Sequence, residues 1–319
     1  MGNDADYRKF LIAFAAVLAT LAAVVGVFNY VVDPYNLNGR FDLGLDKARI
    51  SYGANHLLYK IAEFDRKPRP NIILGDSRMN YLKTEKVEAA ARAPYSNLAY
   101  GGGMIKEAID TYWFASRRTH LKNAVFGVNM TFYRENLKSE KNHVGEAESF
   151  LKFKINYYLS SLITKVSVYN IVYKLTGRYI GPVVAIPRDR EKLWALQLGN
   201  YTKGFYSGYR YPHALRARLE EMARDCERRG TRLILVIPPT HVDLQRKITE
   251  YHLEREYAMY KRDLARIAPV IDFDYPNEWT RNKKLFEDPY HCNESIREKM
   301  IKEVWTGNLR VGRLLGGGK

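Results

Sequence analysis

The chain has 319 residues, of which 46% are hydrophobic and 13% aromatic, so it is long and apolar enough for one large or two small folded domains and is not a disordered chain. Its 51 lysines and arginines against 35 aspartates and glutamates give a formal net charge of +16, which indicates an anionic partner: nucleic acid, an anionic membrane face or an acidic polymer. The two cysteines, Cys226 and Cys292, exclude a disulfide-rich scaffold and a four-cysteine zinc site, and we interpret them as small buried residues.

The first predicted element is a transmembrane helix over residues 10–32, which are 23 residues without a charge. As a helix this segment reaches roughly 34 Å, enough to cross a bilayer core with some tilt. A buried core helix and a cleaved signal peptide are the alternatives, and we favour an uncleaved anchor. Arg8 and Lys9 precede the segment and Asp33 follows it, so the positive-inside rule leaves residues 1–9 as a cytoplasmic tail. The remainder would lie outside the cytoplasm, where a nucleic-acid partner is not expected and anionic lipid or an anionic glycan fits the positive charge better.

After a connector over residues 33–69, short apolar runs alternate with amphipathic stretches. The predicted strands are 71–74, 95–98, 124–128, 232–237 and 270–272, and the predicted helices are 84–92, 104–119, 214–229, 251–267 and 294–305. Because the strands are nearly all apolar and alternate with helices, they predict an α/β domain over 70–307 with a parallel sheet covered on both faces. The tail over 308–319 ends in Gly-Gly-Gly-Lys, and we expect it to be frayed.

A long interruption over residues 131–211 separates the third strand from the next helix. It holds fifteen aromatic residues mixed with lysines and arginines. Because it follows a strand end, where α/β folds place their ligands, it is interpreted as an inserted aromatic-rich cap. The alternative is a structural helical insertion whose aromatic side chains form its own core.

Glycines and polar residues follow three of the predicted strands. In Leu74-Gly75-Asp76-Ser77-Arg78, Gly75 allows a sharp turn, and Ser77 lies where its hydroxyl is exposed and its N–H can face a developing oxyanion. Gly101-Gly102-Gly103 lets the backbone approach a ligand and offers a free N–H. Asn129, at the end of the third strand, can donate its amide to an oxyanion. Taken singly, each of these patterns is also typical of a turn or a helix cap.

The fourth piece is Asp288-Pro289-Tyr290-His291, directly before the last predicted helix. A catalytic histidine needs a carboxylate that fixes its tautomer and stabilises the imidazolium. A spacing of three residues in an irregular loop lets Asp288 reach one imidazole nitrogen while the other faces Ser77. The alternative is a helix-capping aspartate beside an incidental histidine.

In this order, the four pieces resemble the SGNH (GDSL-like) hydrolase superfamily, whose blocks are named for Ser, Gly, Asn and His. The resemblance covers roughly residues 70–305. It implies a three-layer, flavodoxin-like parallel sheet and a serine-dependent acyl-transfer site. Carried over, Ser77 is the nucleophile, His291 the general base and Asp288 its orienting acid. The oxyanion donors are the N–H of Ser77, Gly102 and Asn129.

The sequence also departs from the superfamily pattern. Arg78 stands where the GDSL form has Leu, Asn129 is followed by Met130 instead of the usual Asp, and the insertion over 131–211 is atypical. These departures bear on the substrate class more than on the triad.

The order of anchor, Asp33-Pro34-Tyr35 and Gly-Asp-Ser-Arg resembles a narrower group. This group comprises membrane-anchored SGNH-like proteins of bacterial cell-envelope polymer acylation, among them the alginate O-acetylation proteins and the teichoic-acid D-alanylation protein DltD. The resemblance implies a single-pass protein of the bacterial inner membrane with a periplasmic catalytic domain. A membrane-bound O-acyltransferase (MBOAT) would supply the acyl group, and the partner would be an anionic polysaccharide or a teichoic-type polymer. No cofactor is expected.

The function expected is O-acyl transfer, most simply O-acetyl transfer, to a cell-envelope or secreted polysaccharide through an acyl-Ser77 intermediate. An esterase acting on the same polymer and a noncatalytic glycan-binding or assembly subunit remain alternatives. Five further residues are candidates for contact with substrate: Arg78, Tyr100, Tyr133, His241 and Tyr290. For His241, packing within a loop is the alternative. Asp272 and Asp274 have no third ligand at a suitable spacing, so no metal site is expected.

Overall fold

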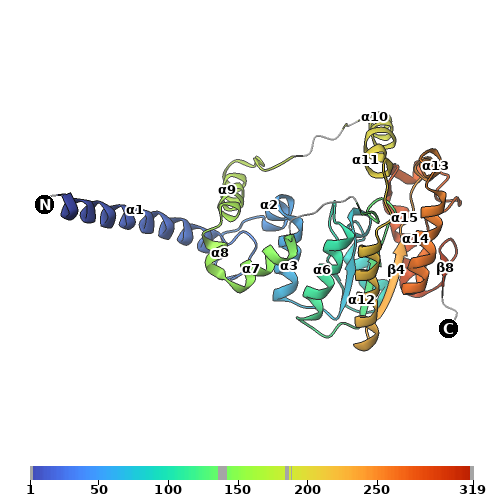
Figure 1. Ribbon diagram of the computed structural model, residues 1–319, viewed down its shortest axis with the longest axis horizontal. Helices are drawn as coiled ribbons and strands as arrows, with labels where there is room; N and C mark the ends of the chain where they lie inside the picture. Colours follow the sequence, from blue (N-terminus) through green and yellow to red (C-terminus); the bar gives the residue numbers. More distant parts are fainter. Residues whose placement is uncertain (1–2, 136–141, 184–186, 188, 317–319) are drawn as a thin grey trace. The chain divides into compact units, whose positions relative to one another are not determined.

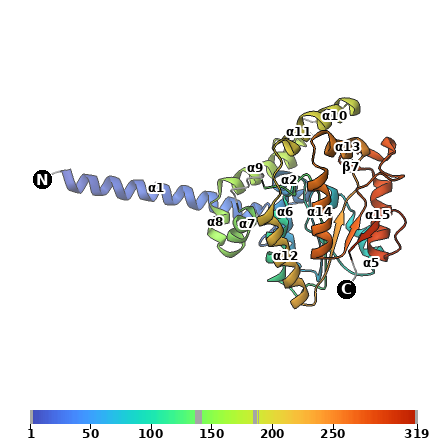
Figure 2. The same ribbon diagram turned by 45° about the vertical axis from the view of Figure 1, so that its right-hand side comes forward.

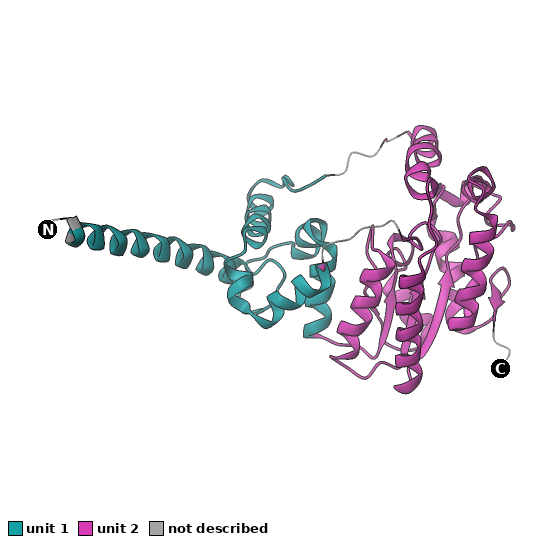
Figure 3. Cartoon of the chain, viewed as in Figure 1, with its two compact units in different colours: residues 1–66, 143–183 teal, residues 67–142, 184–319 magenta. Residues whose placement is uncertain are grey.

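The computed structural model describes residues 3–135, 142–183, 187 and 189–316, which form two compact units (Figure 3). Unit 1 combines residues 1–66 with 143–183, and unit 2 combines 67–142 with 184–319. Each unit is thus built from two separate stretches of chain.

All the regular secondary structure in the described part of unit 1 is helical. Its helices are α1 (Asn3–Val32), α2 (Lys47–Ala54), α3 (His56–Arg66), α7 (His143–Lys152), α8 (Lys154–Tyr158) and α9 (Ser161–Thr176). From Asp6 to Val32, α1 is long and apolar enough to cross a membrane, and most of its side chains are exposed. Helices α8 and α9 lie against the C-terminal part of α1 (Figure 1).

The polar residue Asn29 holds the C-terminal end of α1 to these two helices. It is fully buried, and its Nδ2 donates to the carbonyl of Tyr158 at 2.7 Å and to Thr164 Oγ1 at 2.8 Å. Ser167 donates to Asn29 Oδ1 at 2.9 Å. A buried amide is costly unless it is hydrogen-bonded, and this one has a partner on each atom.

Asp33 organises the turn that follows α1. One carboxylate oxygen accepts from the N–H of Leu37 at 2.8 Å and from Tyr157 Oη at 3.1 Å. The other accepts from the N–H groups of Asn38 at 2.7 Å and Gly39 at 3.1 Å. The first residue of the Asp-Pro-Tyr sequence therefore has a structural role in unit 1.

We expect Asp33→Ala to destabilise unit 1 by roughly 3 kcal/mol, because it leaves two buried donors, the N–H of Leu37 and the hydroxyl of Tyr157, without this acceptor. The measurement is limited proteolysis of the detergent-solubilised chain, with cleavage sites assigned by mass spectrometry. Sites within 33–66 and 143–183 should be cut faster. The control is Asp42→Ala, which removes an exposed carboxylate that accepts from the N–H of Gly44 in its own turn. Equal cleavage of the two variants would contradict the structural role of Asp33.

The structure divides the connector and the inserted segment differently from the sequence-based prediction. The connector predicted over 33–69 contains α2 and α3, and the segment predicted as one cap over 131–211 is shared between the two units. Its helices α7 to α9 pack against α1 to α3 through apolar side chains that both groups bury. Such packing between distant stretches leaves no local signal, which is why composition alone suggested a single cap.

Unit 2 is built on a six-stranded sheet. The strands are β1 (Asn71–Leu74), β2 (Ser96–Asn97), β3 (Asn123–Gly127), β4 (Arg232–Ile237), β5 (Val270–Asp272) and β8 (Arg313–Leu315). Their order is β2-β1-β3-β4-β5-β8; the first five are parallel, and β8 pairs antiparallel with β5. The predicted parallel α/β sheet is confirmed. A separate hairpin pairs β6 (Phe286–Asp288) with β7 (His291–Cys292).

Helices cover both faces of this sheet. On one side lie α6 (Ile105–Ser116), α12 (His213–Arg228) and α14 (Glu254–Ile267), and on the other lie α5 (Thr84–Ala91) and α15 (Glu294–Thr306) (Figure 2). The shorter elements are α4 (Ser77–Asn80), α10 (Arg190–Leu196), the π-helical turn Gln197–Tyr201, α11 (Thr202–Tyr206), α13 (Val242–Glu250) and the 3-10 turn Lys283–Leu285. The three-layer arrangement is therefore as predicted, and both cysteines are buried and free.

Two further predictions about unit 2 need correction. Helix α13 was not predicted, and the helix predicted from residue 251 begins at Glu254. The tail predicted to be frayed contains β8, which is anchored at Arg313 by an ion pair with Asp272 at 3.0 Å. A strand that pairs with a segment distant in the sequence gives no local signal beside a glycine-rich end. Residues 317–319 of that tail lie outside the described part of the chain.

Candidate active site

Three chemically important segments meet at the carboxyl edge of the sheet in unit 2. Ser77 follows β1, the Gly101–Gly103 turn follows β2, and Asn129 follows β3. Strand β1 lies between the other two and pairs in parallel with both. The strand order turns from one direction to the other here, which is where open parallel sheets place their ligands.

The turn after β1 requires glycine at residue 75. Its φ is 138°, a value that residues with a Cβ rarely adopt. A Cβ there would also lie 2.8 Å from Met79 Cγ and 3.0 Å from the carbonyl oxygen of Gly127. The absence of a side chain therefore lets β1 and β3 pass close to the start of α4, which carries Ser77.

Gly127 is needed for a different reason, namely space. A Cβ at this position would lie 2.1 Å from Met79 Cγ and 2.7 Å from its Sδ. Met79 is fully buried in α4, two residues after Ser77, so a Cβ at residue 127 would force the Met79 side chain or α4 itself to shift.

We expect Gly127→Ala to lower the free energy of unfolding of unit 2 by about 1–3 kcal/mol, the usual cost of overpacking a core. All four tryptophans, Trp113, Trp194, Trp279 and Trp305, lie in unit 2, so tryptophan fluorescence in urea is the measurement. Gly199→Ala is the control, because its Cβ would meet nothing within 4 Å. Adding Met79→Ala should recover part of the loss; equal midpoints for both single variants would contradict the steric account.

Ser77, His291 and Asp288 form a continuous chain of hydrogen bonds. Ser77 Oγ lies 2.7 Å from His291 Nε2, and His291 Nδ1 lies 2.7 Å from Asp288 Oδ2. The other carboxylate oxygen of Asp288 accepts from the N–H groups of Tyr290 at 2.8 Å and His291 at 3.0 Å. The loop thus fixes the carboxylate, the carboxylate orients the imidazole, and Nε2 can accept the serine proton.

The surroundings of Asp288 favour its ionised form. Burial alone would raise the pKa of Asp288, but the hydrogen bond and charge of His291 and the N–H of Tyr290 together lower it below its ordinary value of 3.8. The ionised Asp288 therefore stabilises the folded state fully above pH 3.8, its ordinary pKa. This contribution is lost as the pH falls through the lower pKa that Asp288 has in the folded protein. At neutral pH the carboxylate is ionised and can stabilise an imidazolium.

Two backbone N–H groups, that of Ser77 itself and that of Gly102, are available for an oxyanion. In the described part of the chain, the N–H groups of Ser77 and Gly102 donate no hydrogen bond. Gly102 has a φ of 73°, and open space lies where its Cβ would be. The adjacent Gly103 lies close to the turn after β1, because its Cβ would be 3.1 Å from the carbonyl oxygen of Gly75.

Asn129 is held in place by both ends of its amide. Its Nδ2 donates to Asp76 Oδ2 at 2.9 Å, and its Oδ1 accepts from the N–H of Phe132 at 3.1 Å. An amide nitrogen carries two hydrogens, so one remains for an oxyanion. The N–H groups of Ser77 and Gly102 and the side-chain amide of Asn129 therefore all lie at the carboxyl edge of the sheet.

The buried carboxylate of Asp76 has three partners. It accepts from the N–H of Arg78 at 3.0 Å, which caps α4, and from Asn129. It also forms an ion pair with the guanidinium of Arg78, with Nη2 to Oδ2 at 2.7 Å and Nε to Oδ2 at 3.0 Å. Burial alone would lower the pKa of Arg78, but Asp76 raises it, so the guanidinium remains charged. Arg78 is thus a buried structural partner of Asp76.

The other predicted substrate contacts are also largely buried and contact other residues of unit 2, although the buried hydroxyl of Tyr133 has no hydrogen-bond partner among the described residues. Tyr100 donates to Glu107 at 2.5 Å, and Tyr290 bonds to Thr202 at 2.9 Å. Tyr133 is fully buried against Tyr211 and Tyr260. The prediction that these tyrosines face a substrate is therefore corrected, because their rings fill the core of unit 2.

His241 follows the packing alternative. It is buried, it caps α13 by accepting from the N–H of Asp243 at 3.1 Å, and its ring contacts Trp194 and Phe286. Burial lowers the pKa of His241 despite the nearby carboxylate of Asp243, so the ring tends to be neutral.

Tyr81, which no sequence pattern singles out, lies at the rim of the site. Its ring packs edge-on against His291 with centroids 5.6 Å apart. The guanidinium of Arg297 lies over the Tyr81 ring, 5.5 Å from its centroid. Tyr81 is 48% exposed, so a large aromatic surface is open to solvent beside the imidazole. Its position four residues after Ser77, at the end of α4, is the sequence feature that could have predicted its place near the site.

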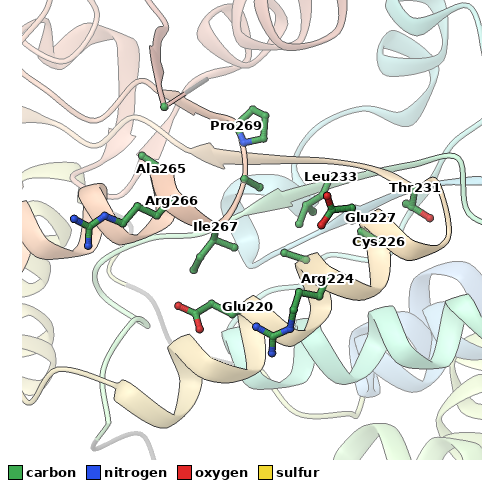
Figure 4. A pocket seen from close by; sticks show the side chains of 13 residues that line it. Glu220, Arg224, Cys226, Glu227, Thr231, Leu233, Ala265, Arg266, Ile267 and Pro269 are labelled. Atoms are coloured by element: carbon green, nitrogen blue, oxygen red, sulfur yellow. The ribbon is translucent and has the colours of Figure 1, made fainter. Parts of the chain in front are cut away.

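A different cavity, of about 910 Å³, lies at the opposite edge of the sheet (Figure 4). Its lining comes from the C-terminal half of α12, the start of β4 and the segment that precedes β5, including Arg224, Leu233 and Pro269. Because it lies at the amino ends of the strands, it does not belong to the site around Ser77.

Three of the solved structures to which the chain is similar are bacterial proteins. A protein of Streptococcus pneumonia described as a platelet activating factor matches with 7% identity and a TM-score of 0.43, over 82% of this chain and 94% of that one. A lipolytic protein of the G-D-S-L family from Desulfitobacterium hafniense DCB-2 matches with 11% identity and a TM-score of 0.35, over 75% and 98%. An acylhydrolase of Bacteroides fragilis NCTC 9343 matches with 11% identity and a TM-score of 0.37, over 83% and 99%.

No protein-family model matches the sequence, and no curated protein matches it.

Proposed function

We propose that the chain is a serine-dependent acyltransferase that moves an acyl group, most simply acetyl, to a polysaccharide hydroxyl. The observation that carries the proposal is the chain of two 2.7 Å hydrogen bonds from Ser77 through His291 to Asp288. A serine hydroxyl is a weak nucleophile unless a positioned base removes its proton, and this arrangement supplies that base.

In the acylation step, Ser77 Oγ attacks the carbonyl carbon of an ester or thioester while its proton passes to His291 Nε2. Asp288 stabilises the imidazolium that results. The oxyanion accepts from the N–H groups of Ser77 and Gly102 and from the amide of Asn129, and each such donor is typically worth about 3 kcal/mol. Collapse of the tetrahedral intermediate breaks the bond to the leaving group, which takes the proton from His291, and acyl-Ser77 remains.

In the second step the roles reverse. A sugar hydroxyl gives its proton to His291 and attacks the acyl carbonyl, and Ser77 leaves with that proton. An exposed aromatic ring beside the base supports a sugar acceptor, because sugars bind through the apolar faces of their rings. Tyr81 offers such a surface next to His291. The formal charge of +16 supports an anionic polymer as the substrate.

We also propose that α1 anchors the protein in the bacterial inner membrane, with unit 2 and the part of unit 1 that follows α1 in the periplasm. The length and apolar character of the helix and the basic pair Arg8 and Lys9 before it support this orientation. Exposed apolar side chains at Phe153, Ile155 and Leu159 lie on and beside α8, next to α1, and are suited to a lipid interface. A membrane-bound O-acyltransferase in the same membrane would supply the acyl group.

The test follows the fate of the acyl group. The purified full-length chain in detergent is loaded with acetyl from 4-nitrophenyl acetate, and decay of acetyl-Ser77 is followed by intact mass with and without a sugar acceptor. We expect the acceptor to speed the decay and to yield an acetylated sugar. Release of acetate to water alone would identify an esterase, and failure to acylate Ser77 would favour a noncatalytic binding subunit.

A further inference from the structure

A second, smaller cavity of about 270 Å³ lies beside the proposed active site in unit 2. Six apolar side chains form much of its lining: Met104, Ile105, Phe132, Pro212, Ala214 and Leu215. Three cationic residues, Lys106, Arg134 and Arg218, and the single carboxylate of Glu135 complete it. A cavity of this size has room for about one monosaccharide unit.

Two walls of this cavity continue directly from the oxyanion donors. Met104 and Ile105 follow Gly103 in the chain and begin α6. Phe132 is tied to the third donor, because its N–H donates to Asn129 Oδ1 at 3.1 Å. Its ring also contacts Phe205 with centroids 5.5 Å apart, and Phe205 contacts Tyr290, the neighbour of His291, at 6.3 Å. Parts of the cavity lining therefore belong to the same two chain segments that carry Gly102 and Asn129.

Arg134 is the unusual residue in the lining. It is 7% exposed, and its Nη1 donates to the carbonyl oxygens of Gly204 (at 2.7 Å) and Phe205. Its Nε is buried and has no hydrogen-bond partner. In the described part of the chain no carboxylate forms an ion pair with it, whereas Arg218 and Lys106 both pair with Asp110.

A buried guanidinium without a counter-charge is expensive for a fold to maintain. The two carbonyl oxygens hold Arg134 in position but do not neutralise it. Planar guanidinium groups bind carboxylate and phosphate oxygens through paired N–H donors, and such charge-assisted bonds are the strong ones. The unpaired charge of Arg134 is thus best explained by an anion that enters the cavity from outside.

We propose that this cavity binds the anionic substituent of the acceptor sugar, a carboxylate or a phosphate, with Arg134 as its principal contact. The proposal rests on the proposed function, since it assigns the acceptor subsite of that same site. The sugar ring would lie on the apolar wall formed by Phe132 and Leu215. Its hydroxyl would then face the acyl group on Ser77, beside Gly102 and Asn129. Selection of acidic sugars would arise in the site itself, in addition to the overall positive charge of the chain.

The test measures binding in a chain that cannot turn over. Calorimetry of full-length Ser77→Ala in detergent compares methyl β-D-glucuronide, glucose 6-phosphate and neutral methyl β-D-glucoside. We expect one or both anionic sugars to bind roughly 10-fold to 100-fold more tightly than the glucoside, the range for a charged hydrogen bond. Adding Arg134→Gln should abolish this preference, and Arg134→Lys should retain part of it.

The matched control is Arg262→Gln in the same Ser77→Ala background, which removes one exposed positive charge from α14. It should leave the preference intact. Ala214→Trp fills the exposed rim of the cavity without touching the chemistry of Arg134, and it should weaken the anionic sugars even if Arg134→Gln fails to fold. Equal binding of all three sugars to the parent chain, or an unchanged preference in Arg134→Gln or Ala214→Trp, would overturn the proposal. Because binding is measured without Ser77, failure of the acyl-transfer proposal would leave these results interpretable.

Discussion

Replacing Ser77 by Ala should reduce the burst of 4-nitrophenol from 4-nitrophenyl acetate by at least about 10³-fold, because the attacking oxygen is removed and only the oxyanion donors remain. His291→Ala should cost nearly as much, since the hydroxyl then has no base at 2.7 Å. Asp288→Asn should cost on the order of 10⁴-fold or less, through loss of the preferred tautomer and of the charge that stabilises the imidazolium.

These three effects should not add. Residues that act as a unit give nearly the same loss singly and together, so Ser77→Ala combined with His291→Ala should be no slower than Ser77→Ala alone. Ser207→Ala is the control, because this exposed serine ends α11. A normal burst in Ser77→Ala, or additive losses in the double variant, would contradict a shared role for the triad.

The second large effect is expected at Asp76. Asp76→Ala removes the cap of α4, leaves the buried guanidinium of Arg78 without its partner and frees the amide of Asn129. Removing one member of a buried ion pair typically costs about 3–5 kcal/mol, because the remaining charge has no solvent or counter-charge. The urea midpoint of the tryptophan fluorescence of unit 2 should fall accordingly.

A double variant separates the buried charge from the other losses. Asp76→Ala combined with Arg78→Met should recover much of the stability, since no unpaired charge is then buried. The double variant should not recover activity, because Asn129 still lacks the carboxylate that positions its amide. Asp110→Ala is the control, because its partners Lys106 and Arg218 are partly exposed and can be solvated. If Asp76→Ala unfolded at the same urea concentration as Asp110→Ala, the structural role assigned to the buried pair would be wrong.

The sequence predicted the site more completely than the rest of unit 2 for a physical reason. Ser77 and Asn129 each follow an apolar strand that is recognisable locally, and Gly102 follows the short polar strand β2. Parallel strands place their carboxyl ends at one edge. Convergence then follows from the topology alone. His291 and Asp288 are close in sequence, so their mutual geometry is also largely local. The aromatic residue Tyr81 escaped notice because its value depends on exposure, which a sequence pattern does not give.

What the sequence did not predict depends on contacts between distant segments. Arg78 follows Ser77 and was expected to contact substrate, yet the buried carboxylate of Asp76 takes its guanidinium. Tyr133 carries an aromatic ring like any substrate-stacking residue, and only its burial against Tyr260 shows a core role. The division of the inserted segment between two units and the pairing of β8 with β5 also depend on contacts between segments that are distant in the sequence.

The most direct test of the central claim is to identify the residue that a serine-directed fluorophosphonate modifies. The full-length chain is labelled at neutral pH, digested and mapped by mass spectrometry. We predict a single adduct on Ser77, absent from Ser77→Ala and strongly reduced in His291→Ala. An adduct on another residue, or none on a folded chain whose tryptophan fluorescence is native, would contradict the proposal that Ser77 is an activated nucleophile.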